Sequence, residues 1–478
     1  MAQAAAVLGA FGVPLVLVTR SHLAILAGLA LIAAAEVLFA SDRHVSASQA
    51  ALGLVGLGVL ATAAAFLVFR PALVLPALLL AAPFRLPLDF GPEHRLYVAL
   101  ARGGEAGRLL PLYFVLAAAA LALAYRLVRG HEPKALPPEI AVPLAALTSW
   151  ACFSYLWSDA TVPAENLLVY FLLPFAVLVA VAARAPFPVW MPRALGAIAV
   201  ALAGLFAVVG LVEEATHRLI FYTPSVEVGN AYSSFFRVTS LFRDPSLYGR
   251  HVVLGIAVLL VALLYSRISW PLGLAAMAVL FAGLFYSYSQ SSLVALFAVT
   301  LFVGVFTGDR TVRLVAAGAA VLVVAAVAVY VGDKAATHSA ERVTSDRSRR
   351  VEFTARVFEH HPFVGVGIGS QPRASQRLSD DGRPPTLYVS HTTPLTVAAE
   401  LGAVGLAFYV ALLLGAARAL ARLCRLDEPF GVALSAVFLA LVVHSLAYSG
   451  FFEDPLTWLA LGLASSALAA TRTAARTA

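Results

Sequence analysis

Apolar runs of about 20 residues recur along the whole 478-residue sequence, and they restrict what this chain can fold into. Each run is long enough to cross a hydrocarbon core of about 30 Å as an α-helix, in which the backbone satisfies its own hydrogen bonds. Hydrophobic residues make up 61% of the chain and charged residues only 12%. The sequence therefore predicts an all-α polytopic membrane protein.

We expect roughly 12–15 transmembrane helices, because some runs are short or interrupted by proline. The first run is followed at once by Arg20 and a second run, which favours a retained helix over a cleaved signal peptide. The apolar runs lie near residues 5–18, 22–40, 49–69, 71–84, 109–128, 139–157, 164–183, 189–213, 247–265, 270–285, 288–307, 312–331, 394–416, 429–449 and 455–471.

Basic residues cluster on alternate short loops, and such loops usually face the cytoplasm. The intervening loops, 85–108, 158–163, 214–246 and 332–393, are then expected to face outward. The net charge of +7 has to be interpreted by its location in such a protein, and it gives no indication of nucleic-acid binding. The basic residues are Arg126, Arg129, Lys134, Arg184, Arg193, Arg267, Arg310, Arg313, Arg418, Arg422 and Arg425.

Residues 332–393 form the longest polar stretch and divide the chain into three parts. Transmembrane helices, with the outward loop 214–246, fill residues 1–331, and C-terminal transmembrane helices fill residues 394–478. The polar stretch holds nine basic and seven acidic residues, a charge content that an anionic lipid-linked substrate would use. Its residues 348–361 mix apolar and charged side chains, which predicts a helix on the membrane surface, covering the site.

Three glycines follow that helix in alternation: Gly365, Gly367 and Gly369. They allow close approach of the backbone to a ligand or to a neighbouring helix. No strand precedes them, so the pattern does not indicate nucleotide binding. The two cysteines, Cys152 and Cys424, lie far apart and imply neither a disulfide nor a cysteine metal site.

His391 stands where the polar stretch turns into an apolar helix, and it is the candidate for chemistry. Pro394 suits the first turn of a helix, and Thr392 or Thr393 can cap it. A helix N-terminus favours anions and a neutral imidazole, which is the form a general base needs near pH 7. The alternative is a histidine that only caps the helix. Glu400, nine positions on, falls on the opposite face and is expected to support packing.

Arginines in the loop 214–246 form a second candidate group. Arg237 and Arg243 stand six residues apart among aromatic residues, and their guanidinium groups match diphosphate oxygens. The alternative is snorkelling at the interface with an Arg243–Asp244 contact. Gln290 lies in the polar break YSYSQSS, which is either a tight turn or a cavity lining. His444, inside an apolar run, favours a buried hydrogen-bonded role over proton relay.

Four stretches together resemble the O-antigen ligase and polymerase superfamily of bacterial membrane glycosyltransferases. The resemblance extends from about residue 140 to residue 420. The stretches are LWSDATVPAENLLVYFLLPF (156–175), RVTSLFRDPSLYG (237–249), RRVEFTARVFEHHPFVGVGIG (349–369) and SHTTPLTVAAELGAVGL (390–406).

The resemblance implies a GT-C-like fold and transfer of a glycan from undecaprenyl diphosphate to an acceptor hydroxyl, with inversion and without cofactor or metal. It implies that His391 is the general base. It also implies that Arg237, together with Arg349 or Arg350, holds the diphosphate; Arg347 is a third alternative to Arg349 and Arg350. Two departures weaken parts of this match: Ser246 stands where the family often has Asn, and Gln290 where it often has Ser-Arg.

The resemblance also implies the partners and the location. The donor is an undecaprenyl-diphosphate-linked glycan, the acceptor a glycan or lipid core, and the protein crosses the bacterial inner membrane many times with its site facing the periplasm or exterior. An O-antigen ligase is favoured slightly over a polymerase with the same site. A transporter or flippase of lipid-linked sugar is the rival of another class; the sequence contains no internal repeat of the kind such proteins use.

Overall fold

The computed structural model describes residues 1–40, 47–84, 109–221, 223–307, 347–379, 381–448 and 450–477, together with Arg310 and Leu314. Every regular element within these residues is helical, which confirms the predicted all-α class. The outward loop 85–108, residues 332–346 of the polar stretch and, apart from Leu314, the predicted span 312–331 lie outside the described residues.

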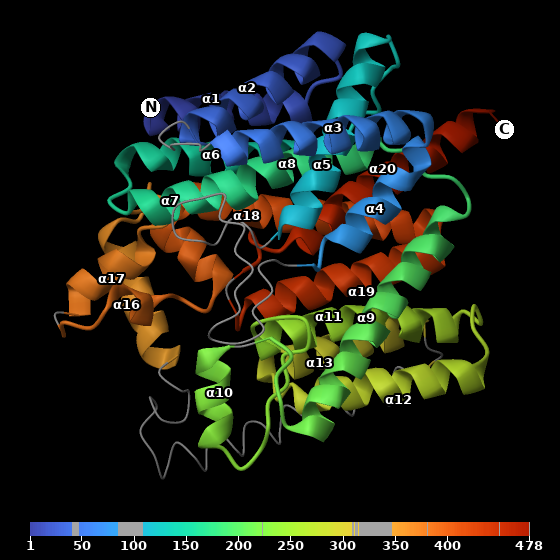
Figure 1. Cartoon of the computed structure of the whole chain (residues 1–478), viewed down its shortest axis with the longest axis vertical. Helices are drawn as coiled ribbons and strands as arrows, with labels where there is room; N and C mark the ends of the chain where they lie inside the picture. The colour runs from blue at the N-terminus through green and yellow to red at the C-terminus, as the bar shows by residue number, and fades with distance from the viewer. Residues whose placement is uncertain are drawn as a thin grey trace.

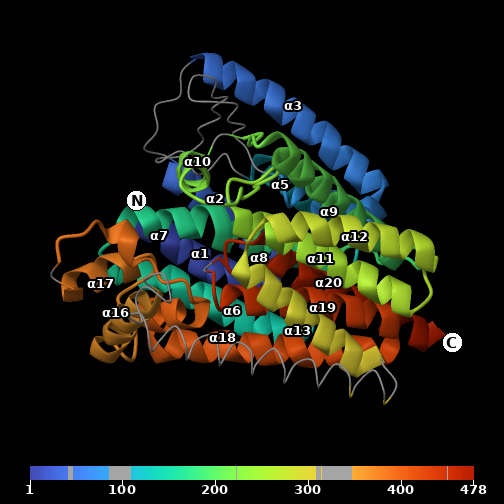
Figure 2. The same cartoon turned by 90° about the horizontal axis from the view of Figure 1, so that it is seen from below.

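Most of the long helices run side by side in a bundle, with two short polar helices at one end (Figures 1 and 2). The short helices, α16 and α17, lie opposite the end at which the C-terminus emerges. The helices are α1 (Ala2–Leu17), α2 (His22–Ala40), α3 (Ala47–Phe69), α4 (Val74–Ala81), α5 (Leu110–Val128), α6 (Pro138–Ser154), α7 (Thr161–Leu167), α8 (Leu173–Arg184), α9 (Met191–Thr216), α10 (Pro224–Ala231), α11 (Pro245–Leu264), α12 (Trp270–Tyr286), α13 (Gln290–Thr307), α16 (Arg347–His360), α17 (Gln371–Ser379), α18 (Thr393–Leu426), α19 (Glu428–Ser445) and α20 (Pro455–Thr477).

Eight helices among the described residues are long and apolar enough to cross a membrane, so the chain is a polytopic membrane protein. A ninth candidate is a bent pair, in which the chain turns by 109° between α3 and α4. The bend falls at Pro71, because proline cannot continue a helix. Four shorter apolar helices accompany them, and the number 12–15 stays a prediction.

Burial differs between the centre and the edge of the bundle. Every residue of α8 except Pro174 is buried, and α8 packs against α1, α5 and α20. In contrast α3 exposes large apolar side chains, including Leu57 at 61% and Phe69 at 81%. An apolar helix surface this exposed is stable in lipid and unfavourable in water.

Helix α18 continues about ten residues beyond the predicted end of its apolar run, through Leu426. The extension is amphipathic: Ala416, Ala419, Leu420 and Leu423 are buried, at the three- and four-residue spacing of one helix face. Arg422 on the other side pairs with Glu139 of α6. The apolar run ends where charges begin, but the helix continues because arginines are compatible with a helix that buries only one face.

A break in α18 shapes the end of the bundle that carries α16 and α17. Gly402 has φ 68° and ψ −169°, a conformation open only to glycine, and the helix changes direction there. Residues 361–369 fill the break. The N–H groups of Val366 and Gly367 donate to the carbonyls of Ala399 and Glu400, and the N–H of Ala403 donates to Pro362 O. Backbone groups freed by the break are therefore hydrogen-bonded within the protein, as the interior of a bundle requires.

The alternating glycines make this insertion possible. Gly365, Gly367 and Gly369 all have positive φ. A Cβ at Gly365 would lie 2.3 Å from Glu400 backbone atoms, and one at Gly367 would lie 2.7 Å from Ser158 Cα. Of the two predicted uses, close approach to a neighbouring helix is confirmed.

Candidate functional site

His391 lies two residues before α18, as predicted, at the bundle end that carries α16. The predicted threonine cap is wrong. Thr392 occupies the N-cap position, but its hydroxyl donates to the carbonyl of Leu446 at 3.2 Å. This bond ties the start of α18 to the end of α19, so the position of His391 depends on two helices.

Arg350 of α16 contacts His391 directly. Its Nη1 lies 2.9 Å from His391 Nε2, and a guanidinium can only donate, so the imidazole accepts there and carries its proton on Nδ1. Burial, followed by the charges of Arg350 and Arg347, lowers the pKa of His391 to about 4, while Asp244 acts in the opposite direction. The imidazole is therefore neutral at pH 7, as expected for a general base.

Spacing along α16 separates the three competing arginines. Arg347 and Arg350 are three residues apart and share the face toward His391. Arg349 points elsewhere: it pairs with Asp381 at 2.8 Å and lies 5.5 Å from the centre of the Phe353 ring. The structure brings Arg350, and not Arg349, to the histidine.

The loop before α11 contributes a second cationic group. Arg237 is half-buried, and its Nε donates to Ser287 O at 3.5 Å, while Asn230 bonds both backbone groups of Arg237. Burial lowers the pKa of Arg237, and the nearby Asp244 opposes this shift. Asp244 caps α11 through the N–H groups of Ser246 and Leu247. Asp244 thus acts electrostatically on both Arg237 and His391.

Arg243, the neighbour of Asp244, is half-buried in the same loop. Gln290 is the first residue of α13, and its side chain is exposed. The polar break around it is a turn between α12 and α13, the first of the two predicted alternatives. Its neighbours Ser289, Ser291 and Ser292 are buried and hydrogen-bonded to one another.

Gln371, a residue that the sequence did not single out, fixes the segment before His391. It is 1% exposed. Its Nε2 donates to Tyr388 O and to Thr354 Oγ1, and its Oε1 accepts from the N–H of Ser390. One amide therefore joins α16 and α17 to the residue next to His391.

Glu400 supports the same arrangement from α18. Its carboxylate is buried and accepts the backbone N–H of Gln371 at 3.3 Å. This contact agrees with the expected packing role. The role of Gln371 could not be predicted from the sequence around it, because its hydrogen-bond partners come from three separate segments.

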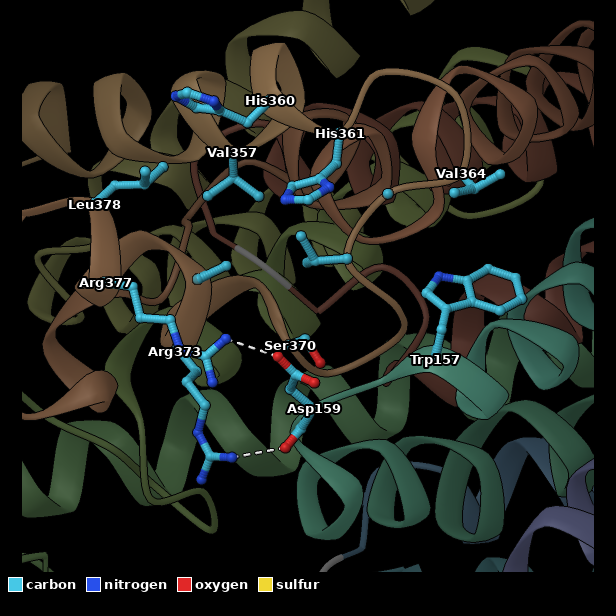
Figure 3. A pocket seen from close by; sticks show the side chains of 13 residues that line it. Trp157, Asp159, Val357, His360, His361, Val364, Ser370, Arg373, Arg377 and Leu378 are labelled. Carbon is cyan, nitrogen blue, oxygen red and sulfur yellow. Dashed lines mark hydrogen bonds and ion pairs between the residues drawn. The ribbon is translucent and has the colours of Figure 1, made fainter.

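Two cavities lie near these groups. One, of about 630 Å³, lies between the C-terminal half of α16, α17 and the turn before α7, and Figure 3 shows its lining. The other, of about 500 Å³, lies beside α10 and includes Asn230, the partner of Arg237. Among the described residues, no three His, Cys, Asp or Glu side chains gather as metal ligands would.

Fold and site together define a polytopic α-helical membrane protein with an arginine-flanked neutral histidine at one end of its bundle. The O-antigen ligase family model matches residues 275–410, which confirms the resemblance to the O-antigen ligase and polymerase superfamily. The match includes α16, the glycine segment and His391; the stretches 156–175 and 237–249 lie outside it. It supports a ligase- or polymerase-type role in membrane glycan processing. No curated protein matches the chain.

Proposed function

We propose that the protein is an inverting membrane glycosyltransferase that moves a glycan from undecaprenyl diphosphate to an acceptor hydroxyl. The observation that carries the proposal is the 2.9 Å contact between neutral His391 and Arg350, beside Arg347. Asp244 acts electrostatically on both His391 and Arg237, which links the second cation to the same region. A base and a set of cations at one place match the two charges that the reaction develops. The family match over residues 275–410 supports the same class of reaction.

His391 acts as the general base in this proposal. Its Nε2 takes the proton of the acceptor hydroxyl while the oxygen attacks the anomeric carbon from the face opposite the diphosphate. The bond from that carbon to the diphosphate oxygen breaks, so a single displacement inverts the configuration and undecaprenyl diphosphate leaves.

Arg350 links the base to the leaving group. In the free protein its guanidinium occupies the Nε2 lone pair of His391. A bound diphosphate competes for that guanidinium, because hydrogen bonds between two ionised groups are stronger than one to a neutral imidazole. Binding of the donor therefore releases Nε2 for the acceptor, and Arg347 and Arg237 stabilise the charge that grows on the diphosphate.

The location and the acceptor follow from the same reasoning. The site faces the periplasm or exterior of a bacterial inner membrane in this proposal, because the short basic loops lie at the other ends of the helices. The long polar stretch 332–393 is also basic, but long loops are less constrained by the positive-inside rule. We favour a ligase, whose acceptor is a lipid core or other surface acceptor, and a polymerase that extends lipid-linked glycan is the second candidate.

The test is transfer by the purified protein in a chelator, with an undecaprenyl-diphosphate glycan from its own cell. Product formed only with the lipid core present supports a ligase, and lengthened lipid-linked glycan without it supports a polymerase. Movement of the lipid-linked glycan across liposome membranes, with no transfer, would favour a flippase and contradict the proposal.

A further inference from the structure

The larger cavity lies beside the C-terminal half of α16, whereas His391 contacts the N-terminal half at Arg350. None of the residues assigned to transfer lines this cavity. Its lining includes Val357 and His360, seven and ten residues beyond Arg350. At 1.5 Å per helical residue these positions are about 10–15 Å along α16 from the contact with His391. A molecule that occupies this cavity and also reacts at His391 must therefore be extended over at least that distance.

The cavity has one rigid aromatic wall. Trp157 is 36% exposed and faces the cavity, where Figure 3 shows its indole across from two arginines. Its ring lies 5.6 Å from that of Trp150, and Trp150 donates to Leu401 O at the break of α18. The indole is thus held by a second tryptophan, and its exposed part adds apolar surface to the cavity lining.

The opposite wall is cationic. Arg373 and Arg377, one turn apart on α17, both approach Asp159: Arg373 Nη1 lies 2.6 Å from its carbonyl oxygen and Arg377 Nη1 2.7 Å from its carboxylate. Each guanidinium has five N–H donors, so each keeps donors beyond this contact. Two arginines against one aspartate leave one formal positive charge, and His360 and His361 lie at the rim.

These two walls fit an acidic sugar. A pyranose ring has an apolar C–H face that packs on an indole, and its hydroxyls and carboxylate accept from guanidinium groups. The volume, about 630 Å³, is within the range of small-molecule sites. A single net charge matches a carboxylate better than a diphosphate.

We propose that this cavity, which we call the α17 subsite, binds a negatively charged sugar of the substrate glycan several units away from the reacting bond. The assignment of the ligand to a substrate glycan rests on the proposed transferase function. The subsite would hold the glycan in place while its reacting end lies at His391, and it would make the protein selective for glycans that carry acidic sugars.

Direct binding tests the subsite without any transfer. The full-length protein in neutral detergent is titrated with hexagalacturonate and, separately, with neutral maltohexaose. We expect hexagalacturonate to bind more tightly, with an affinity that falls as salt rises. Equal binding of both, or equal competition by a short-chain anionic phospholipid, would overturn the proposal.

Three variants separate the subsite from general damage. Arg377→Gln should weaken hexagalacturonate binding about fivefold, the scale of one exposed charge contact. Asp159→Asn should strengthen it, because the competing carboxylate is gone. Arg356→Gln, an exposed arginine of α16 paired with Glu352 and outside the cavity, should leave it unchanged. Loss of structure would weaken binding in both of the first two variants, and that outcome contradicts the proposal.

The transfer reaction identifies which substrate enters the subsite. If Arg377→Gln raises KM for the donor, the donor glycan occupies it; if KM for the acceptor rises, the acceptor glycan does. Unchanged values for both would overturn the assignment. Binding of hexagalacturonate by a protein that transfers nothing would contradict the proposed function and leave the subsite supported.

Discussion

Two histidines, His391 and His444, stand at the same end of the bundle, and their surroundings differ. His391 is half-buried and bonded to an arginine. His444 is 0% exposed, and its Nε2 lies 3.1 Å from Ser291 Oγ, within the buried group of serines. The Thr392–Leu446 bond joins their two segments. The fold thus places two histidines near each other, of which His391 is partly exposed and accessible to a substrate while His444 is fully buried.

The difference extends to the ion pairs around each histidine. Near His444, Arg250 of α11 pairs with Asp454 at 2.7 Å, and the two side chains are 4% and 1% exposed. Near His391, Arg349 pairs with Asp381 at 2.8 Å, with 26% and 21% exposed. A buried pair holds helices in fixed positions, whereas a half-exposed one can exchange its partners for a substrate. We infer that the buried residues around His444 support the bundle, and that chemistry takes place around His391.

Replacing each histidine by alanine should separate these roles most clearly. His391→Ala removes the base, and we expect transfer to fall by about 10²–10⁴-fold with little change in thermal stability. His444→Ala removes the imidazole partner of the buried Ser291 hydroxyl, which keeps only its contact with Ser289, and should lower the unfolding midpoint while the folded molecules still transfer. Turnover by His391→Ala equal to wild type would make His391 only a residue at a helix start.

Breaking the buried ion pair should have the next largest effect. Arg250→Met removes the charge that compensates the buried Asp454 carboxylate, which costs about 3–5 kcal/mol of stability. The double variant Arg250→Met/Asp454→Leu should recover much of that loss, because no uncompensated charge remains. Thermal unfolding in detergent measures both. Equal stability of Arg250→Met and the wild type would show that the pair does not support the bundle.

The break in α18 gives a smaller effect with a matched control. At Gly402 a Cβ would lie 2.1 Å from Phe363 O, and φ is 68°. We expect Gly402→Ala to cost about 3 kcal/mol, through overpacking and backbone strain. Gly382 has nearly the same φ, 67°, but open space around it, so Gly382→Ala should cost only about 1 kcal/mol. Similar unfolding midpoints for the two variants would mean that the inserted segment yields easily.

The sequence could predict features that depend on a local pattern, but not contacts between distant segments. Apolar runs predicted most helix positions, because lipid demands a local pattern that a single segment displays. The place of His391 at a helix start and the close approach at Gly365 were also local features. The helices α10 and α17 were not predicted, since short polar helices have no apolar run to mark them. Helical spacing puts Arg347 and Arg350 on one face of α16 and Arg349 on another, but it does not say which face meets His391, and only the structure shows this.

Contacts between distant segments had no such signal. Asp454, just before α20, is buried against Arg250 of α11, and nothing in the sequence around either residue indicates this pair. Gln371 gains its role only when α16, α17 and the segment before His391 meet. Both depend on packing between elements far apart in the chain, which the sequence pattern of either element does not encode.

The smallest expected effect concerns the protonation of His391, and it tests the contact that distinguishes this histidine from His444. After burial, Arg350 is the largest cause that holds the pKa of His391 at about 4, because a nearby positive charge disfavours the imidazolium. Arg350→Gln removes that charge, so the pKa should rise from about 4 toward the ordinary value of about 6.5. Titration of the imidazole signals by NMR in detergent measures this without any substrate. Arg349→Gln is the control: the neighbouring arginine pairs with Asp381, so its loss should leave the pKa of His391 nearly unchanged. Equal shifts in both variants would mean that the overall charge of α16, and not the direct contact, keeps the histidine neutral.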